Sequence, residues 1–107
     1  MNKTYAETEP SRAEVDALTG PALIEFGAPW CGHCQAAQAL IEAALPAGLL
    51  IKHLKIQDGP GLRLGRSFRV KLWPTLVFMN NGQEVSRLVR PGDAASIADA
   101  IAAITSP

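Results

Sequence analysis

Cysteine is scarce in this 107-residue chain, which contains only Cys31 and Cys34. Two such closely spaced residues cannot form the set of disulfides that stabilises many small secreted domains. Aromatic residues are also few, at 6% of the chain, and no apolar run approaches the length of a transmembrane helix. Ten basic and ten acidic side chains cancel, so the chain as a whole lacks the charge of a nucleic-acid binder. We therefore expect neither a membrane nor a nucleic-acid partner.

The length predicts a single domain with one modest core, covering residues 1–107. Residues 1–9 match no helix or strand pattern, and we expect an extended or partly disordered lead-in. This segment also lacks the apolar run of a signal peptide. Two closely spaced cysteines are typical of a protein in a reducing compartment, so we expect a cytoplasmic location. We also expect a monomer. A secreted protein whose signal peptide had been replaced by an initiator methionine would show the same N-terminus and the same cysteine content.

Charge is unevenly spread although it sums to zero. Residues 52–90 hold eight basic and two acidic side chains, a net charge of +6. Such a segment is either a solvated surface or a basic rim that prefers acidic protein substrates. The sequence favours the solvated surface.

The two cysteines stand where a strand-like segment passes into a helical pattern. Residues 23–26 form a short apolar run, and apolar residues recur at helix spacing after Cys34. The first turn of a helix has unpaired N–H groups and a partial positive charge, which favour a thiolate. At a spacing of i and i+3, Cys31 and Cys34 lie on the same side of the helix and can close and reopen a disulfide. Because so small a loop adds little stability, the pair indicates redox cycling rather than a structural bridge.

The rest of the chain alternates between strand and helix patterns. Ser11 and Glu14 fit a capping box at the start of a short helix that ends near Gly20. Later segments predict a strand at 22–27, a helix from Cys31 to Leu45 that Pro46 and Gly48 break, a strand at 49–56, a small helix at 62–68, hairpin strands at 75–79 and 84–89, and a final helix capped by Asp93. This order predicts an α/β fold in which helices cover a sheet.

Two segments resemble the thioredoxin family. Residues 23–34 are similar to its active-site segment, with Cys31-Gly32-His33-Cys34 at the end. Residues 73–78, followed by Asn81-Gly82, resemble its cis-proline strand and hairpin. The resemblance covers roughly residues 20–104 and implies the thioredoxin fold, a central mixed β-sheet of four to five strands sandwiched by about four helices.

The resemblance also implies roles for residues around the pair. Cys31 is the expected attacking thiolate, which forms a mixed disulfide, and Cys34 is the resolving cysteine. Glu25 matches the buried acid of the family, so we expect it to accept the Cys34 proton. His53 stands where many members carry a lysine that pairs with that acid, which makes it a candidate partner in the proton relay. A lone histidine on a strand is more often an ordinary structural residue, and the sequence favours that reading.

His33 replaces the proline that thioredoxins usually carry and matches the Cys-Gly-His-Cys of protein disulfide isomerase domains. An imidazole beside a thiolate favours the reduced form, so the couple should be more oxidising than that of a common thioredoxin.

The segments that flank the cysteines supply the expected substrate-binding residues. These are Trp30, Gly32, Trp73, Pro74 and Thr75. Pro74 lies at the family's cis-proline position and has no N–H, which leaves neighbouring backbone groups for an extended substrate. The two tryptophans would supply an apolar platform, unless they serve ordinary core packing.

These features predict a thiol–disulfide oxidoreductase that acts on protein disulfides, serves cell redox homeostasis and needs no cofactor beyond its own dithiol. Its expected partners are disulfide-bearing proteins and a thioredoxin reductase-like or glutathione electron donor. Within the enzyme class, a more oxidising disulfide exchanger or isomerase is the alternative. Outside it, the sequence leaves open a zinc site formed by both cysteines with His33 and His53, and a thioredoxin-fold binding or assembly module with incidental redox activity.

Overall fold

The computed structural model describes residues 1–45 and 51–105. Helices and strands follow one another in the order that the sequence predicts. They are α1 (Arg12–Asp16), β1 (Pro21–Gly27), α2 (Gly32–Ala44), β2 (Lys52–Gln57), α3 (Arg63–Ser67), β3 (Thr75–Asn80), β4 (Gln83–Val89) and α4 (Ala94–Thr105). The predicted helix break at Pro46 and Gly48, and the predicted strand start at Leu49, lie outside the described residues.

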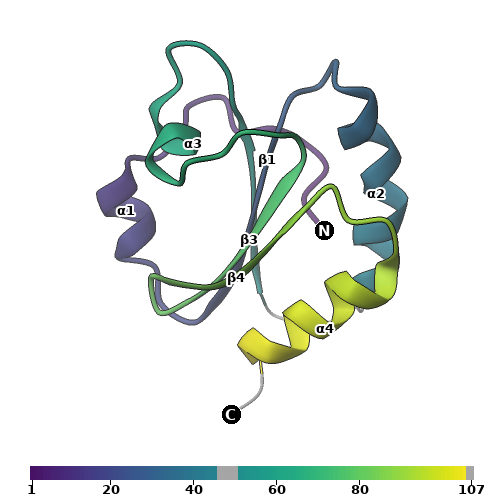
Figure 1. Ribbon diagram of the computed structural model, residues 1–107. Coiled ribbons are helices and arrows are strands. Elements are labelled where there is room, and N and C mark those ends of the chain that lie inside the picture. Colours follow the sequence, from purple (N-terminus) through teal and green to yellow (C-terminus); the bar gives the residue numbers. More distant parts are fainter. Residues whose placement is uncertain (46–50, 106–107) are drawn as a thin grey trace.

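The strands of the described chain form one mixed sheet with the order β2-β1-β3-β4 (Figure 1). Strand β1 pairs with β2 in parallel and with β3 antiparallel, and β3 pairs antiparallel with β4. Helices α1 and α3 lie on one side of the sheet, and α2 and α4 lie on the other (Figure 1). This arrangement confirms the predicted thioredoxin fold.

Strand β1 is the centre of the core because both of its faces are covered. Residues 22–27 are all buried. Ile24 and Phe26 pack into the apolar cluster that includes residues of α1 and α3, whereas Leu23 packs into the cluster that includes residues of α2 and α4. Glu25 is the charged member of this strand, and its side chain therefore has to find its partners inside the protein.

The lead-in forms no helix or strand, but it is held against the folded chain at several points. The N–H of Ala6 donates to the carbonyl of Lys55 at 2.9 Å. The Glu9 carboxylate accepts hydrogen bonds from the N–H groups of Arg63 and Leu64, at the start of α3. The lead-in is thus anchored to β2 and α3, and it reaches the neighbourhood of the cysteines.

That residues 1–107 form a single domain stays a prediction.

The hairpin turn between β3 and β4 fits tightly against the end of α1. Asn81 and Gly82 have φ angles of 49° and 77°, in the left-handed region that glycine tolerates best. The Asn81 side-chain oxygen accepts a hydrogen bond from the N–H of Gly20 at 2.8 Å. A Cβ atom on Gly82 would overlap the carbonyl oxygen of Asp16.

We expect Gly82→Ala to lower the free energy of unfolding by about 2–3 kcal/mol, because alanine is strained at this φ and its methyl would displace Asp16. In a domain of this size the melting temperature should fall by roughly 10–20 °C. Circular dichroism during heating measures the change. Gly92→Ala is the matched control, since nothing lies within 4 Å of a Cβ built there. Equal melting temperatures for the two variants would contradict the described turn.

Candidate active site

Cys31 ends the connection from β1 and caps helix α2. Its sulfur accepts a hydrogen bond from the N–H of Cys34 at 3.1 Å, and its own N–H donates to the carbonyl of Ala28. The Cys31 side chain is partly exposed, and both cysteines are free thiols. The cysteine that is partly exposed is therefore also the one at the positive end of the helix, where negative charge is stabilised.

Cys34 lies one turn into α2 and is only 2% exposed. Burial, together with the hydrogen bond to Cys31 and the charges of Cys31 and Glu25, raises the pKa of the Cys34 thiol to about 12. The backbone of Ala28 acts in the opposite direction and lowers this pKa. At neutral pH Cys34 is therefore a thiol, and it needs a nearby proton acceptor before it can attack.

Glu25 is completely buried, and each oxygen of its carboxylate has a partner. One oxygen lies 3.0 Å from Nε2 of His53. The other accepts a hydrogen bond from the Gln38 amide at 2.8 Å and lies 3.9 Å from the Lys55 ammonium. The structure thus places His53 beside Glu25, the contact that the resemblance raised and the sequence did not favour. It adds Lys55 and Gln38, which the sequence patterns did not single out.

The lead-in fixes which nitrogen of His53 carries the proton. The N–H of Asn2 donates to Nδ1 of His53 at 3.0 Å, so Nδ1 must be an acceptor. The proton then sits on Nε2, where it points at the Glu25 carboxylate. His53 therefore acts as a hydrogen-bond donor that orients Glu25.

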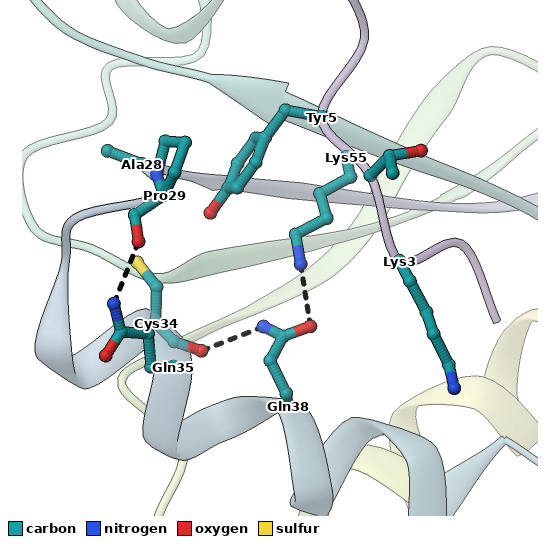
Figure 2. Close-up of a pocket in the computed structure, with 9 residues that line it drawn as sticks. Lys3, Tyr5, Ala28, Pro29, Cys34, Gln35, Gln38 and Lys55 are labelled. Atoms are coloured by element: carbon teal, nitrogen blue, oxygen red, sulfur yellow. Dashed lines mark hydrogen bonds between the residues drawn. The ribbon is translucent and has the colours of Figure 1, made fainter.

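A pocket of about 470 Å³ opens beside the buried thiol on the side covered by the lead-in (Figure 2). Tyr5, Cys34, Gln38 and Lys55 are among its lining residues. The Gln38 amide nitrogen donates to the carbonyl of Cys34, and its oxygen accepts from Lys55, both at 2.8 Å. Gln38 therefore links Cys34 to Glu25, because the same nitrogen also donates to Glu25.

The predicted substrate-binding residues occupy different environments. Trp30 is 67% exposed, and Gly32 is exposed as well. Pro74 and Thr75 are buried, and the Trp73–Pro74 peptide bond is cis. Trp73 is half-buried, and its indole N–H donates to Asp58 at 2.9 Å. Of the two tryptophans, Trp30 is thus the one with more of its surface exposed.

A second pocket, of about 230 Å³, brings His33 and Pro74 together with Arg90. The Arg90 backbone has a φ of 50°, and its N–H donates to the carbonyl of Pro74. The Arg90 side chain donates to the carbonyl of Trp73 at 2.7 Å. Arg90 therefore borders this second pocket beside Pro74, at the start of the loop that follows β4.

The described residues contain neither a cluster of metal ligands nor a helix that could span a membrane. In residues 1–45 and 51–105, no group of three or more histidine, cysteine or carboxylate side chains is placed to hold a metal ion. His53, a nominal ligand of the zinc site considered above, is engaged with Glu25 and Asn2 instead. None of the helices within those ranges has the length and apolar character needed to cross a membrane.

Comparisons with known proteins match the fold and the segments that build this site. The thioredoxin family model matches residues 4–103. Human protein disulfide-isomerase A2 is 41% identical over 83 residues, which are 72% of this chain and 16% of that protein. The bifunctional thioredoxin reductase/thioredoxin of Mycobacterium leprae is 31% identical over 91 residues, 81% of this chain and 19% of that protein. The chain therefore spans less than a fifth of the length of either relative.

A solved structure extends the similarity over almost the whole chain. Thioredoxin 2 from Pseudomonas aeruginosa PAO1, in its reduced form, has a TM-score of 0.85 and 52% sequence identity to this chain. The match covers 97% of this chain and 96% of that one. The chain belongs to the thioredoxin family of thiol–disulfide oxidoreductases.

Proposed function

We propose that this chain reduces disulfides of protein substrates through a reversible dithiol–disulfide cycle of Cys31 and Cys34. The observation that carries the proposal is the difference in exposure and surroundings between the two free thiols. Cys31 is partly exposed at the N-terminus of α2, whereas Cys34 is buried close enough to Glu25 for the carboxylate charge to raise the pKa of its thiol. The Gln38 amide donates both to the backbone carbonyl of Cys34 and to Glu25. One sulfur can meet a substrate and the other can be deprotonated behind it.

The cycle has two exchange steps. In the first, the Cys31 thiolate attacks one sulfur of the substrate disulfide, a mixed disulfide forms, and the other substrate sulfur leaves as a thiolate. In the second, Glu25 accepts the Cys34 proton, Cys34 attacks the Cys31 sulfur, and the second substrate sulfur leaves. The substrate gains two electrons and the cysteine pair loses two. A reductant must then restore the dithiol.

The partners that we propose are disulfide-bearing proteins and a thioredoxin reductase-like or glutathione donor. The name of the Mycobacterium leprae relative joins a thioredoxin reductase to a thioredoxin, which supports a reductase as the electron source. We also propose that the chain works as a cytoplasmic monomer in cell redox homeostasis. The cysteine content supports the cytoplasmic location, since the only two cysteines of the sequence form the proposed redox pair and none remains for a structural bridge.

The proposal is tested by reduction of a disulfide-bearing protein with dithiothreitol as the electron source. We expect the purified chain to accelerate the reaction catalytically, at concentrations far below that of the substrate. A rate no higher than that of dithiothreitol alone would overturn the proposal. It would leave the thioredoxin-fold binding or assembly module as the function of the chain.

A second candidate function is disulfide exchange or isomerisation, and His33 is the observation that favours it. The side chain is exposed, lies between the two cysteines and lines the pocket that contains Pro74. A hydrogen bond or positive charge from its imidazole would support the ionised, reduced form and make the couple more oxidising.

We expect His33→Pro to make the reduction potential more negative by about 30 mV or more, which corresponds to about 1.4 kcal/mol. Proline is tolerated there because His33 lies in the first turn of α2. Equilibration in glutathione buffers, followed by tryptophan fluorescence, measures the potential. His33→Ala separates the loss of the imidazole from the gain of the proline ring. Unchanged potentials in both variants would exclude a tuning role for His33.

A further inference from the structure

The lead-in places the only tyrosine of the chain beside the buried cysteine. Tyr5 is half-buried, and its side chain extends into the pocket that Cys34 and Lys55 also line (Figure 2). The Lys55 ammonium lies 4.8 Å from the centre of the Tyr5 ring. The N–H of Ala6, the next residue, donates to the carbonyl of Lys55, which anchors the backbone here. Contacts with Lys55 of β2 thus fix the position of both the backbone and the side chain around Tyr5.

Gly27 allows the tyrosine hydroxyl to approach the sulfur. A Cβ atom built on Gly27 would lie 2.5 Å from the Cys34 sulfur and 3.1 Å from the Tyr5 hydroxyl oxygen. The sulfur and the hydroxyl therefore converge on the small volume that any larger residue at position 27 would occupy. The contact of Tyr5, Cys34 and Gly27 does not involve the second pocket, which His33 and Pro74 line.

The tyrosine hydroxyl keeps its proton over the whole physiological range. Burial raises the pKa of Tyr5 above its ordinary value, and the negative charges of Cys34 and Glu25 beside it raise it further. A protonated tyrosine can donate a hydrogen bond to the sulfur next to it. Donation to an ionised acceptor is stronger than donation to a neutral one, so the thiolate benefits more than the thiol.

We propose that Tyr5 is a further active-site residue, whose hydroxyl donates a hydrogen bond to the Cys34 sulfur and stabilises the thiolate that resolves the mixed disulfide. This inference rests on the proposed function. Tyr5 forms no covalent bond and keeps its proton, while Glu25 remains the proton acceptor. The hydroxyl should therefore act on the second exchange step and leave the first step unchanged.

The expected size of the effect follows from two opposing consequences. Loss of a hydrogen bond to a charged group should raise the pKa of Cys34 by about one unit, which reduces its thiolate fraction about tenfold at neutral pH. A more basic thiolate is a better nucleophile, and this recovers about threefold. The net expectation for Tyr5→Phe is a second step about threefold slower, with its pH profile displaced by about one unit to higher pH.

The test is a stopped-flow reaction of the reduced protein with the chromogenic disulfide dithiobis-nitrobenzoate. Attack by Cys31 releases the first coloured thiolate, and attack by Cys34 on the resulting mixed disulfide releases the second. Tyr5→Phe should slow only the second phase and displace its pH profile. Lys3→Ala is the control, because Lys3 lines the same pocket and its side chain extends away from the sulfur (Figure 2). It should leave both phases within about 1.5-fold of the parent.

Each outcome has one meaning. An unchanged second phase in Tyr5→Phe, or an equal slowing of both phases, would overturn the role of Tyr5. A parent protein without a second phase would overturn the proposed function instead. The unmodified protein offers a further check, because its single tyrosine can be titrated by tyrosinate absorbance. Its pKa should be lower in the oxidised protein, since closing the disulfide removes the thiolate charges; identical values in both redox states would contradict the proposal.

Discussion

Cys31→Ser is expected to abolish disulfide reduction, with turnover lowered by roughly a factor of 10³ or more. The reason is that Cys31 is the sulfur that combines exposure with the positive end of α2, where the Cys34 N–H also donates to it. A serine hydroxyl at this place is not ionised at neutral pH and cannot form a mixed disulfide. Cys34 cannot take over because it is almost fully buried.

Turnover with dithiothreitol and a disulfide-bearing protein measures this prediction, and the chromogenic disulfide gives a second measure. In the latter assay Cys31→Ser should release neither coloured thiolate rapidly, whereas Cys34→Ser should release one. Unfolding curves establish that both variants are folded. If Cys31→Ser retained a tenth or more of the parent activity, the assignment of Cys31 as the attacking group would be wrong.

Glu25→Gln is expected to slow the second exchange step by about 100-fold, the lower end of what loss of a general base costs. The substitution keeps the size of the side chain but removes the proton acceptor. The variant loses the Glu25 charge, but burial and Cys31 still hold the pKa of the Cys34 thiol above its ordinary value. Cys34 then depends on hydroxide or solvent for its ionisation, because it remains protonated below that pKa. Its thiolate fraction rises about tenfold per pH unit below that value, so the second step should accelerate steeply as pH increases.

The stopped-flow assay measures this effect because its two phases separate the two cysteines. Glu42→Gln is the matched control, since Glu42 is an exposed glutamate of α2. It should change neither phase. The free energy of unfolding must be measured as well, because Glu25→Gln leaves the buried Lys55 without its carboxylate neighbour. A second phase as fast as that of the parent would rule out Glu25 as the proton acceptor.

Local sequence signals account for most of the fold. The Ser11–Glu14 capping box forms at α1 with both of its reciprocal hydrogen bonds. The apolar run at 23–26 became a strand buried on both faces, and Asn81-Gly82 became the hairpin turn. Each of these features depends on residues that are close together in the sequence, which is why sequence patterns reveal it. The same run predicted that Glu25 is buried, whereas its role beside the cysteines came from the resemblance to the thioredoxin family.

The buried network was only partly visible in the sequence. Lys55 is two residues beyond His53 on β2, so the alternation of a strand already placed both on one face. Gln38 is one helical turn beyond Cys34, which could have identified it in the same way. Tyr5 gave no such signal, because its approach to Cys34 depends on how a segment without periodicity runs over β2 and on the missing side chain of Gly27.

The mixed-disulfide mechanism can be tested by mass spectrometry of Cys34→Ser after it has reacted with a disulfide-bearing protein. Without the resolving cysteine, we expect a covalent one-to-one adduct through Cys31 that dithiothreitol dissociates. Peptide mapping should find the mixed disulfide at Cys31. The absence of any adduct, under conditions in which the parent reduces the same substrate, would contradict this mechanism.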